Sequence, residues 1–136
     1  MRYFTPDEAN RALPRVRPLV ERLVEARRES LRLEERLGAV RRRVLGNGGG
    51  LDPARIEELQ TEATAAAKAV LELAERLDDL GVQVKDPDTG LVDFPARHPD
   101  GTDVLLCWRL GEDAVAFWHT LDGGFRGRRP LPFGRT

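Results

Sequence analysis

Apolar residues in the first two-thirds of the chain recur in alternating steps of three and four, the spacing of one face of an α-helix. Between residues 16 and 44 the repeating positions are Val16, Leu19, Leu23, Ala26, Ser30, Leu33, Leu37, Val40 and Val44. A second series follows at Ile56, Leu59, Ala63, Ala66, Val70, Leu73, Leu77 and Leu80. Each series is a heptad seam, so the pattern predicts two long helices that pack along these seams in a coiled-coil-like way.

Local signals indicate where these helices begin and break. Thr5 and Glu8 have the spacing of a capping box, and Pro6 occupies the first helical position. Pro14 and Pro18 lack the amide hydrogen that a helix interior needs. We therefore expect a short N-terminal helix to break just before Pro14, and the long helix to start at one of these prolines.

The two predicted helices are joined by a short glycine-rich stretch, Gly46–Gly50. Asp52 and Pro53 can cap and start the second helix, and Gly81 can end it in a left-handed conformation. Because the loop is short, the pattern predicts an antiparallel hairpin. Each arm would be on the order of 45 Å long at ~1.5 Å per residue.

Folding the chain about residue 48 pairs the two seams in one register, with a narrow waist where Ser30 meets Ala66. The first long helix also carries a second apolar stripe outside the seam, at Val20, Val24 and Leu31. A small sheet is not expected to reach along so long an arm. The stripe therefore predicts a partner helix pair, most simply a second copy that completes a four-helix bundle. The alternative is that these residues lie singly on a solvated face.

After residue 81 the apolar period changes to two, which is typical of β-strands. Such runs occur at 82–84, 91–94, 104–110 and 114–120, separated by turn-forming stretches. They predict an antiparallel sheet of about four strands, with Cys107 and Arg109 on one face and Leu106 and Trp108 on the other. The basic tail 123–136 has no element pattern, so it either wraps over the sheet or crosses to another subunit.

The expected fold is therefore a single α+β domain over residues 1–136. It consists of a helical hairpin with a short N-terminal helix over 6–81, and a β-rich segment with a basic tail over 82–136. Charged residues make up 33% of the 136 residues, yet the formal net charge is −1, so no overall field attracts nucleic acid or an anionic membrane. We accordingly expect no nucleic-acid partner, the weaker alternative being binding through the arginine-rich tail.

The location is predicted to be cytoplasmic. The single cysteine excludes an internal disulfide, and no opening stretch has the form of a signal peptide. No apolar run approaches the roughly 20 residues that a membrane helix needs. The expectation is a protein without a membrane partner.

Side chains capable of chemistry gather in the β-rich segment. Cys107 and His119, on neighbouring predicted strands, can form a nucleophile and its base, as in a Cys–His hydrolase or redox enzyme. Together with Asp93, or with Asp103 or His98, they can instead hold a metal ion. No CxxC or HExxH spacing accompanies them, so no cofactor is implied by a specific motif. The alternative is that Cys107 is an inert core residue.

The same segment carries cationic and aromatic side chains that suit a small carboxylate or phosphate. The residues of this predicted ligand site are Lys85, Arg109, Trp118, His119 and Arg128. A purely structural explanation is also available: Arg109 pairs with Glu112 or Asp113, and the tryptophans fill the core. In that case His119 satisfies a buried hydrogen bond.

Four segments of the sequence are specific enough to compare with known families: FTPDEANRALP, VKDPDTGLVDFPA, LLCWRLGED and FWHTLDGGFRGRRPL. In this order they resemble an uncharacterised bacterial family, the domain of unknown function 2203. The resemblance spans nearly the whole chain, and its C-terminal block is the most specific part. It implies a small helical hairpin with an appended sheet, and it supplies no activity.

Three classes of function follow from these observations. The first is a dimeric structural or interaction module, which accounts for the seam and the uncovered stripe and is the one we favour. The second is a small-anion or metal-binding sensor built on the C-terminal block. The third is a Cys–His enzyme, although the expectation is that the protein is not an enzyme.

Overall fold

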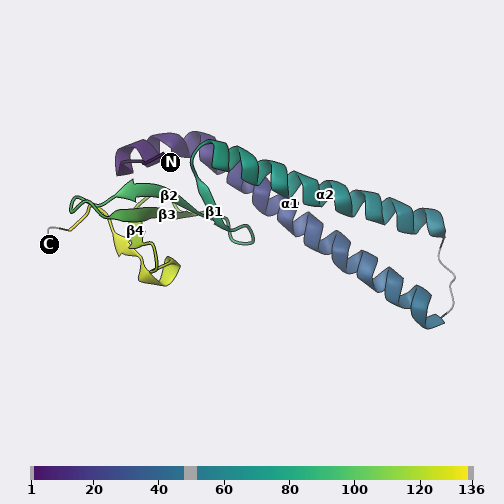
Figure 1. The fold of residues 1–136 in the computed structure, drawn as a ribbon. Helices are drawn as coiled ribbons and strands as arrows, with labels where there is room; N and C mark the ends of the chain where they lie inside the picture. Colours follow the sequence, from purple (N-terminus) through teal and green to yellow (C-terminus); the bar gives the residue numbers. More distant parts are fainter. Residues whose placement is uncertain (1, 48–51, 135–136) are drawn as a thin grey trace.

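Two long helices followed by an antiparallel sheet make up the protein (Figure 1). The computed structural model describes residues 2–47 and 52–134. Helix α1 spans Pro6–Asn47 and α2 spans Pro53–Asp79, and the two pack against each other as an antiparallel hairpin. The α+β class and the hairpin are thus confirmed. Of the predicted glycine loop, Gly46 belongs to α1, and residues 48–50 lie outside the described residues.

Both helices begin where the capping signals predict. The Thr5 amide donates to Glu8 Oε1 at 3.0 Å, and the Glu8 amide donates to Thr5 Oγ1 at 3.1 Å. This reciprocal pair is a capping box, which satisfies two backbone donors at the start of α1. At the start of α2, the Asp52 carboxylate accepts a hydrogen bond from the Ala54 amide at 3.0 Å.

The predicted break in the first helix is wrong, because α1 continues through Pro14 and Pro18. Each proline removes one intrahelical hydrogen bond and costs about 3 kcal/mol in a helix interior. Both proline rings are exposed, whereas Leu13 and Val16 beside them are buried in the core. Packing of this apolar face therefore outweighs the local cost. The helix accommodates the prolines by changing direction along its first part, drawn in purple in Figure 1.

Helix α2 ends as predicted, at a left-handed glycine. Gly81 has a φ of +88°, a conformation that residues with a side chain rarely adopt. The Gly81 amide donates to the Asp78 carbonyl at 2.8 Å, and the Val82 amide donates to the Leu77 carbonyl at 2.9 Å. This pattern satisfies the last carbonyls of the helix and turns the chain directly into the sheet.

The hairpin contains two separate apolar clusters. Leu33, Leu37, Leu59 and Ala63 form the outer one, as the predicted pairing of the seams requires. The remaining seam residues nearer the sheet belong to the main core. Ser30, at the predicted waist, is only 3% exposed. Among the described residues, neither helix is both long and apolar enough to cross a membrane.

The sheet has five strands rather than about four. They are β1 (Gln83–Asp86), β2 (Leu91–Arg97), β3 (Asp103–Arg109), β4 (Phe117–Thr120) and β5 (Arg129–Pro130), in this order across the sheet and all antiparallel. The additional strand lies in the basic tail, after the short 3-10 helix η1 (Phe125–Gly127). Through β5, the tail therefore pairs with β4 of its own chain.

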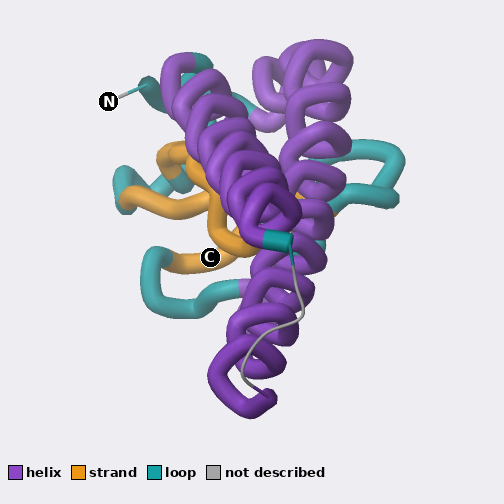
Figure 2. Tube along the Cα trace, turned by 90° about the vertical axis from the view of Figure 1, so that its right-hand side faces the viewer, coloured by secondary structure: helices purple, strands orange, loops and turns teal. Residues whose placement is uncertain are grey.

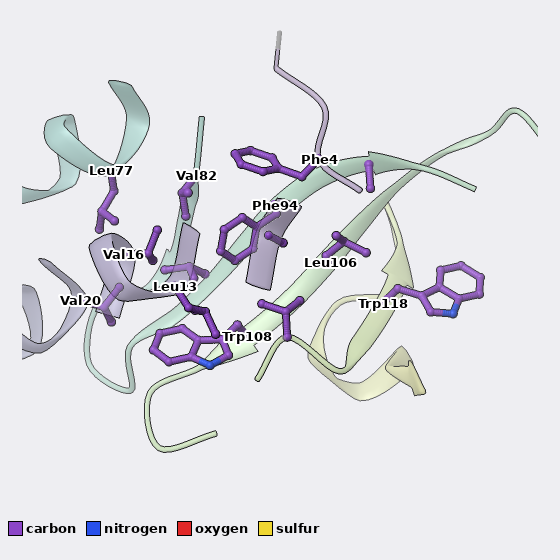
Figure 3. Close-up of a cluster of buried hydrophobic side chains, with 14 of the residues drawn as sticks. Phe4, Leu13, Val16, Val20, Leu77, Val82, Phe94, Leu106, Trp108 and Trp118 are labelled. Carbon is purple, nitrogen blue, oxygen red and sulfur yellow. The ribbon is translucent and has the colours of Figure 1, made fainter. Parts of the chain in front are cut away.

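One face of the sheet, here called the inner face, packs on α1 near the base of the hairpin. Phe94, Leu106 and Trp108 point from β2 and β3 into this core (Figure 3). They meet Leu13 and Val16 of α1 there, and all five side chains are at most 5% exposed. Figure 2, seen from the tip of the hairpin, shows the strands behind the helices. The outer half of the hairpin therefore extends beyond the sheet.

The predicted dimer stripe needs a correction. Val20 and Val24 are 0% and 4% exposed, because the turn between β1 and β2 lies directly on them. A Cβ atom on Gly90 of this turn would come within 3.0 Å of Val20 Cγ1 and 3.2 Å of Val24 Cγ2. The chain's own sheet therefore covers these two valines, contrary to the expectation that it is too short to do so. Leu31, the third residue of the stripe, is 41% exposed.

Polar contacts fix the loop between β3 and β4 to α1. The Asn10 side chain donates to the Val115 carbonyl at 3.1 Å and accepts from the Val115 amide at 2.8 Å. Trp108 Nε1 donates to the Glu112 carbonyl at 3.0 Å. The two Asn10 bonds join residues 105 positions apart and attach the loop to α1, whereas the Trp108 bond closes the loop onto β3.

We expect Leu59→Ala to loosen the outer hairpin while leaving the sheet intact. Leu59 is 1% exposed, and such a truncation costs about 2–5 kcal/mol when the cavity does not collapse. Hydrogen exchange should therefore accelerate around the outer cluster, whereas amides of β2 and β3 should stay protected. Leu71→Ala is the control, since Leu71 is 64% exposed and its loss should change stability by less than about 0.5 kcal/mol. Equal acceleration in the sheet would contradict the separation of the two clusters.

Candidate metal centre

Three side chains that can bind a metal or take part in catalysis meet on the outer face of the sheet, the face turned away from the helices. Asp93 on β2 stands opposite Cys107 on β3, and Leu105 on β3 stands opposite His119 on β4. Because side chains alternate along a strand, Leu105 and Cys107 share one face, and the register places Asp93 and His119 on the same face. Three neighbouring strands therefore each contribute one residue.

These three residues are buried, although they lie on the face without helices. Asp93, Cys107 and His119 are 2%, 0% and 3% exposed. One potential ligand atom from each, a carboxylate oxygen, the sulfur and a ring nitrogen, lies within 4.8 Å of the other two. The structure thus brings together the three residues of the predicted metal site. Whether they bind a metal stays a prediction.

The orientation of His119 is fixed from both sides. Its Nδ1 lies 2.7 Å from the Thr120 carbonyl oxygen, which can only accept, so Nδ1 carries a hydrogen. Its Nε2 lies 3.2 Å from both carboxylate oxygens of Asp93. A single proton is therefore held between His119 and Asp93. Metal-binding histidines are commonly oriented in this way, with the second nitrogen donating to a backbone carbonyl.

The Cys107 thiol is held in its neutral form. Burial raises the pKa of this thiol from 9.0 to about 12, and the negative charge of Asp93 adds to the increase, while Arg128 acts in the opposite direction. A nucleophilic cysteine needs a lowered pKa and a free base beside it. Both ring nitrogens of His119 already have partners, so the geometry does not support the predicted nucleophile–base pair.

A charge pair lies beside this cluster. Arg128 donates from Nη1 to Glu112 Oε2 at 2.9 Å and from Nη2 to Glu112 Oε1 at 2.6 Å. Arg128 Nη2 also donates to the Cys107 carbonyl at 3.2 Å. The guanidinium carbon lies 4.1 Å from the ring centre of Phe117 and 4.6 Å from that of Phe125. This single side chain therefore joins the tail to the strand that carries the thiol.

The surroundings keep this pair ionised. Burial alone would raise the pKa of Glu112, but hydrogen bonds from Arg128 and from the Arg109 amide lower it below its ordinary value. Burial would likewise lower the pKa of Arg128, and Glu112 raises it instead. Arg128 Nε is nevertheless buried without a hydrogen-bond partner among the described residues.

The predicted anion site is not assembled. Trp118 points to the inner face, opposite to His119, because adjacent residues of a strand alternate. Lys85 is exposed on β1, at the far edge of the sheet from β4. Arg109 is exposed with its guanidinium 5.0 Å from the Phe125 ring, and Arg128 is paired with Glu112.

Two further candidate metal ligands lie elsewhere. His98 Nδ1 accepts from the Asp100 amide at 3.1 Å in the turn between β2 and β3. Asp103 is exposed and accepts from the Tyr3 hydroxyl at 3.2 Å. The alternative expectation was that the Arg109 side chain pairs with Glu112 or Asp113. The partners of the Glu112 carboxylate are instead the Arg128 guanidinium and the Arg109 amide. The course of the tail brings Arg128 to Glu112, and no local pattern in the sequence indicates this contact.

Comparison with known proteins gives one match. A family model described as Uncharacterized conserved protein (DUF2203) matches residues 2–131, a range that includes both helices and all five strands. No curated protein and no solved structure matches the chain. The match supports the resemblance noted from the sequence and brings no activity with it.

We expect the Cys107 thiol to stay protonated in the folded, metal-free protein well above the ordinary pKa of 9.0, because burial and Asp93 disfavour the thiolate. The ultraviolet absorbance of the thiolate, recorded against pH and corrected with Cys107→Ala, measures this directly. The same chain in denaturant is the control, and its thiol should ionise near pH 9.0. The raised pKa also predicts that stability falls as the pH rises above 9.0, since only the unfolded state then loses the proton. Ionisation of the folded thiol below the ordinary value would contradict the structure.

Proposed function

This chain belongs to the DUF2203 family of uncharacterized conserved proteins, and we propose that it binds one transition-metal ion, with Zn²⁺ as the best-matched ion. The observation that carries the proposal is the convergence of Asp93, Cys107 and His119 within 4.8 Å on three adjacent strands. Thiolate, imidazole and carboxylate are the ligands that Zn²⁺ prefers. A thiolate together with an imidazole disfavours Mg²⁺ and Ca²⁺, which prefer oxygen ligands.

The charges of the site are consistent with a divalent ion. A bound metal replaces two protons: that of the Cys107 thiol and that held between Asp93 and His119. The deprotonated ligand set then has two negative charges, one on Asp93 and one on Cys107. A divalent cation balances both, so the loaded site is neutral overall. Neutrality matters because uncompensated charge is costly to bury.

The proposed role of the ion is to hold the sheet together. Its three ligands come from β2, β3 and β4, so coordination adds bonds across three strands. An ion that binds only the folded state stabilises it by mass action, and the protein then responds to the free metal concentration. Three side chains leave one position of a tetrahedral site for water or another ligand. The site requires a reduced cysteine, which supports the proposed cytoplasmic location.

We expect the purified chain to bind one Zn²⁺, with an increased melting temperature and about two protons released per ion. Native mass spectrometry gives the stoichiometry, and calorimetry in buffers of different ionisation enthalpy gives the proton count. Co²⁺ in place of Zn²⁺ should show a thiolate-to-metal charge-transfer band. Cys107→Ser and His119→Asn should each weaken binding by at least about tenfold and remove or alter that band.

His98→Asn is the matched control for these variants, because His98 lies outside the cluster and should not affect the affinity. Unchanged binding in Cys107→Ser would overturn the proposed site. So would binding without proton release, since the thiol would then not be a ligand.

A second candidate function belongs to the outer part of the hairpin: docking of partner helices, most simply those of a second copy. The outer apolar cluster is built from the two helices alone, without a covering strand. Exposed leucines occur on this part of the hairpin, Leu31 at 41% and Leu45 at 87%. We propose a homodimer through this part of the arm, in place of the buried valines of the predicted stripe. A four-helix bundle would add a second layer to the cluster.

We expect the double variant Leu31→Glu, Leu45→Glu to be a folded monomer, because two buried carboxylates would oppose a bundle interface. Light scattering after size exclusion measures the mass, and circular dichroism measures folding. Thr64→Glu, an exposed position without apolar character, is the control and should keep the dimer. A wild-type protein of monomer mass, or a folded double variant of dimer mass, would overturn this function.

A further inference from the structure

The three ligand side chains of the candidate metal centre are at most 3% exposed, so an ion cannot reach them unless part of the chain moves. Strands β2 and β3 are unsuitable for this movement, because they pair with each other over seven residues and pack on α1. Strand β1 lies at the far edge of the sheet. The segment after β4 is the remaining candidate.

This segment, here called the strap, comprises residues 121–128 and lies against the ligand residues. The position of a Cβ atom on Gly123 would be 3.6 Å from His119 Cβ, and Arg128 bonds to the Cys107 carbonyl. Figure 1 shows the strap, in yellow, on the side of the sheet away from the helices. It therefore covers the outer face at the point where the cluster lies.

The strap is weakly attached to the sheet. Within the described structure its backbone hydrogen bonds are all local, such as Gly123 to the Thr120 carbonyl and Gly127 to the Gly123 carbonyl. Most of its residues are exposed, including Leu121 at 61% and Phe125 at 38%. Lifting the strap would therefore expose little apolar surface and would break few backbone bonds.

The strong contact of the strap is the Arg128 side chain, whose two bonds to Glu112 are 2.9 and 2.6 Å. A bidentate guanidinium–carboxylate pair is a specific and comparatively strong interaction. Its geometry leaves Arg128 Nε buried without a partner, and that donor regains hydration when the strap lifts. Arg128 thus makes the strongest contact of the closed state, with Phe125 against Arg109 as a weaker one. The closed state is less stable than it would be with all donors satisfied.

We propose that the strap is the gate of the buried site and that the Arg128–Glu112 pair is its latch. The inference rests on the proposed function, since it supplies the route by which a metal ion enters and leaves. When the pair separates, the strap lifts from β3 and β4 and exposes Cys107 and His119. Arg128 and Glu112 act here as positioning residues, because neither is a ligand of the ion.

The test measures access to Cys107 in the metal-free protein. A neutral disulfide reagent, 4,4′-dithiodipyridine, labels the thiol near neutral pH each time the site opens. Glu112→Gln should accelerate labelling at least roughly tenfold, because it removes the charge of a partly buried pair. Glu112 Oε1 accepts from both the Arg109 amide and Arg128 Nη2, and the glutamine oxygen can keep these bonds. The variant therefore removes the negative charge and the second bond, from Arg128 Nη1 to Oε2, while the turn at residue 109 is retained.

Two controls identify the source of the labelling. Glu58→Gln breaks the exposed Arg55–Glu58 pair on α2, and it should leave the labelling rate unchanged. Leu77→Ala lowers the global stability through the main core without touching the strap, and it should also leave the rate unchanged. Low concentrations of urea serve the same purpose if Leu77→Ala does not fold. The latch would be overturned if the labelling rate rose in Leu77→Ala in proportion to its loss of global stability. It would also be overturned if labelling were not faster in Glu112→Gln.

The outcome for the latch is separable from the outcome for metal binding, because labelling uses no metal. Faster labelling without Zn²⁺ binding would support the gate and remove the proposed function. Zn²⁺ binding with unchanged labelling would support the function and remove the latch. If both hold, Glu112→Gln should also accelerate the transfer of Zn²⁺ to an external chelator.

Discussion

A buried carboxylate determines much of what surrounds it in this protein. Asp93 lies in the interior of the sheet with 2% of its surface exposed, where an uncompensated charge is costly. It must share a proton, accept hydrogen bonds or bind a cation. His119 and Cys107 are the groups that meet it, and they reach it because β4 lies beside β3 and β3 lies beside β2. The strand order and the chemistry of the cluster are therefore linked.

The sheet separates two kinds of interior. Its inner face contributes large apolar side chains, Trp108 among them, to a core that α1 closes. Its outer face contributes polar groups and would be solvated without the tail. Arg128 closes this face with its guanidinium on Glu112 and on the Cys107 carbonyl. The tail thus covers the outer face as α1 covers the inner face. Its main contact is a charged pair, whereas α1 contributes buried apolar area.

Local chemistry explains which features the sequence could predict. Capping at Thr5, the heptad seams and the alternation that places Cys107 opposite the core depend only on nearby residues, and all three were predictable. The predicted helix break before Pro14 was wrong, because the burial of its neighbours Leu13 and Val16 outweighs the free-energy cost of a proline inside a helix. Val24 was expected at a dimer interface and Arg128 in an anion site. Their actual partners are the β1–β2 turn and Glu112, and both depend on the path of the whole chain. The candidate ligands could be named, but their convergence required the strand order.

The division of the hairpin into two apolar clusters also has a consequence for the length of the arm. The outer cluster shares no residue with the core beneath the sheet, and its seam repeats with a heptad period. Removing or adding one heptad in each helix would keep both seams in register, while the sheet and the cluster on its outer face would stay unchanged. The reach of the tip would then change by about 10 Å per heptad. Arm length is therefore a variable that natural variation or engineering can adjust independently of the rest of the fold.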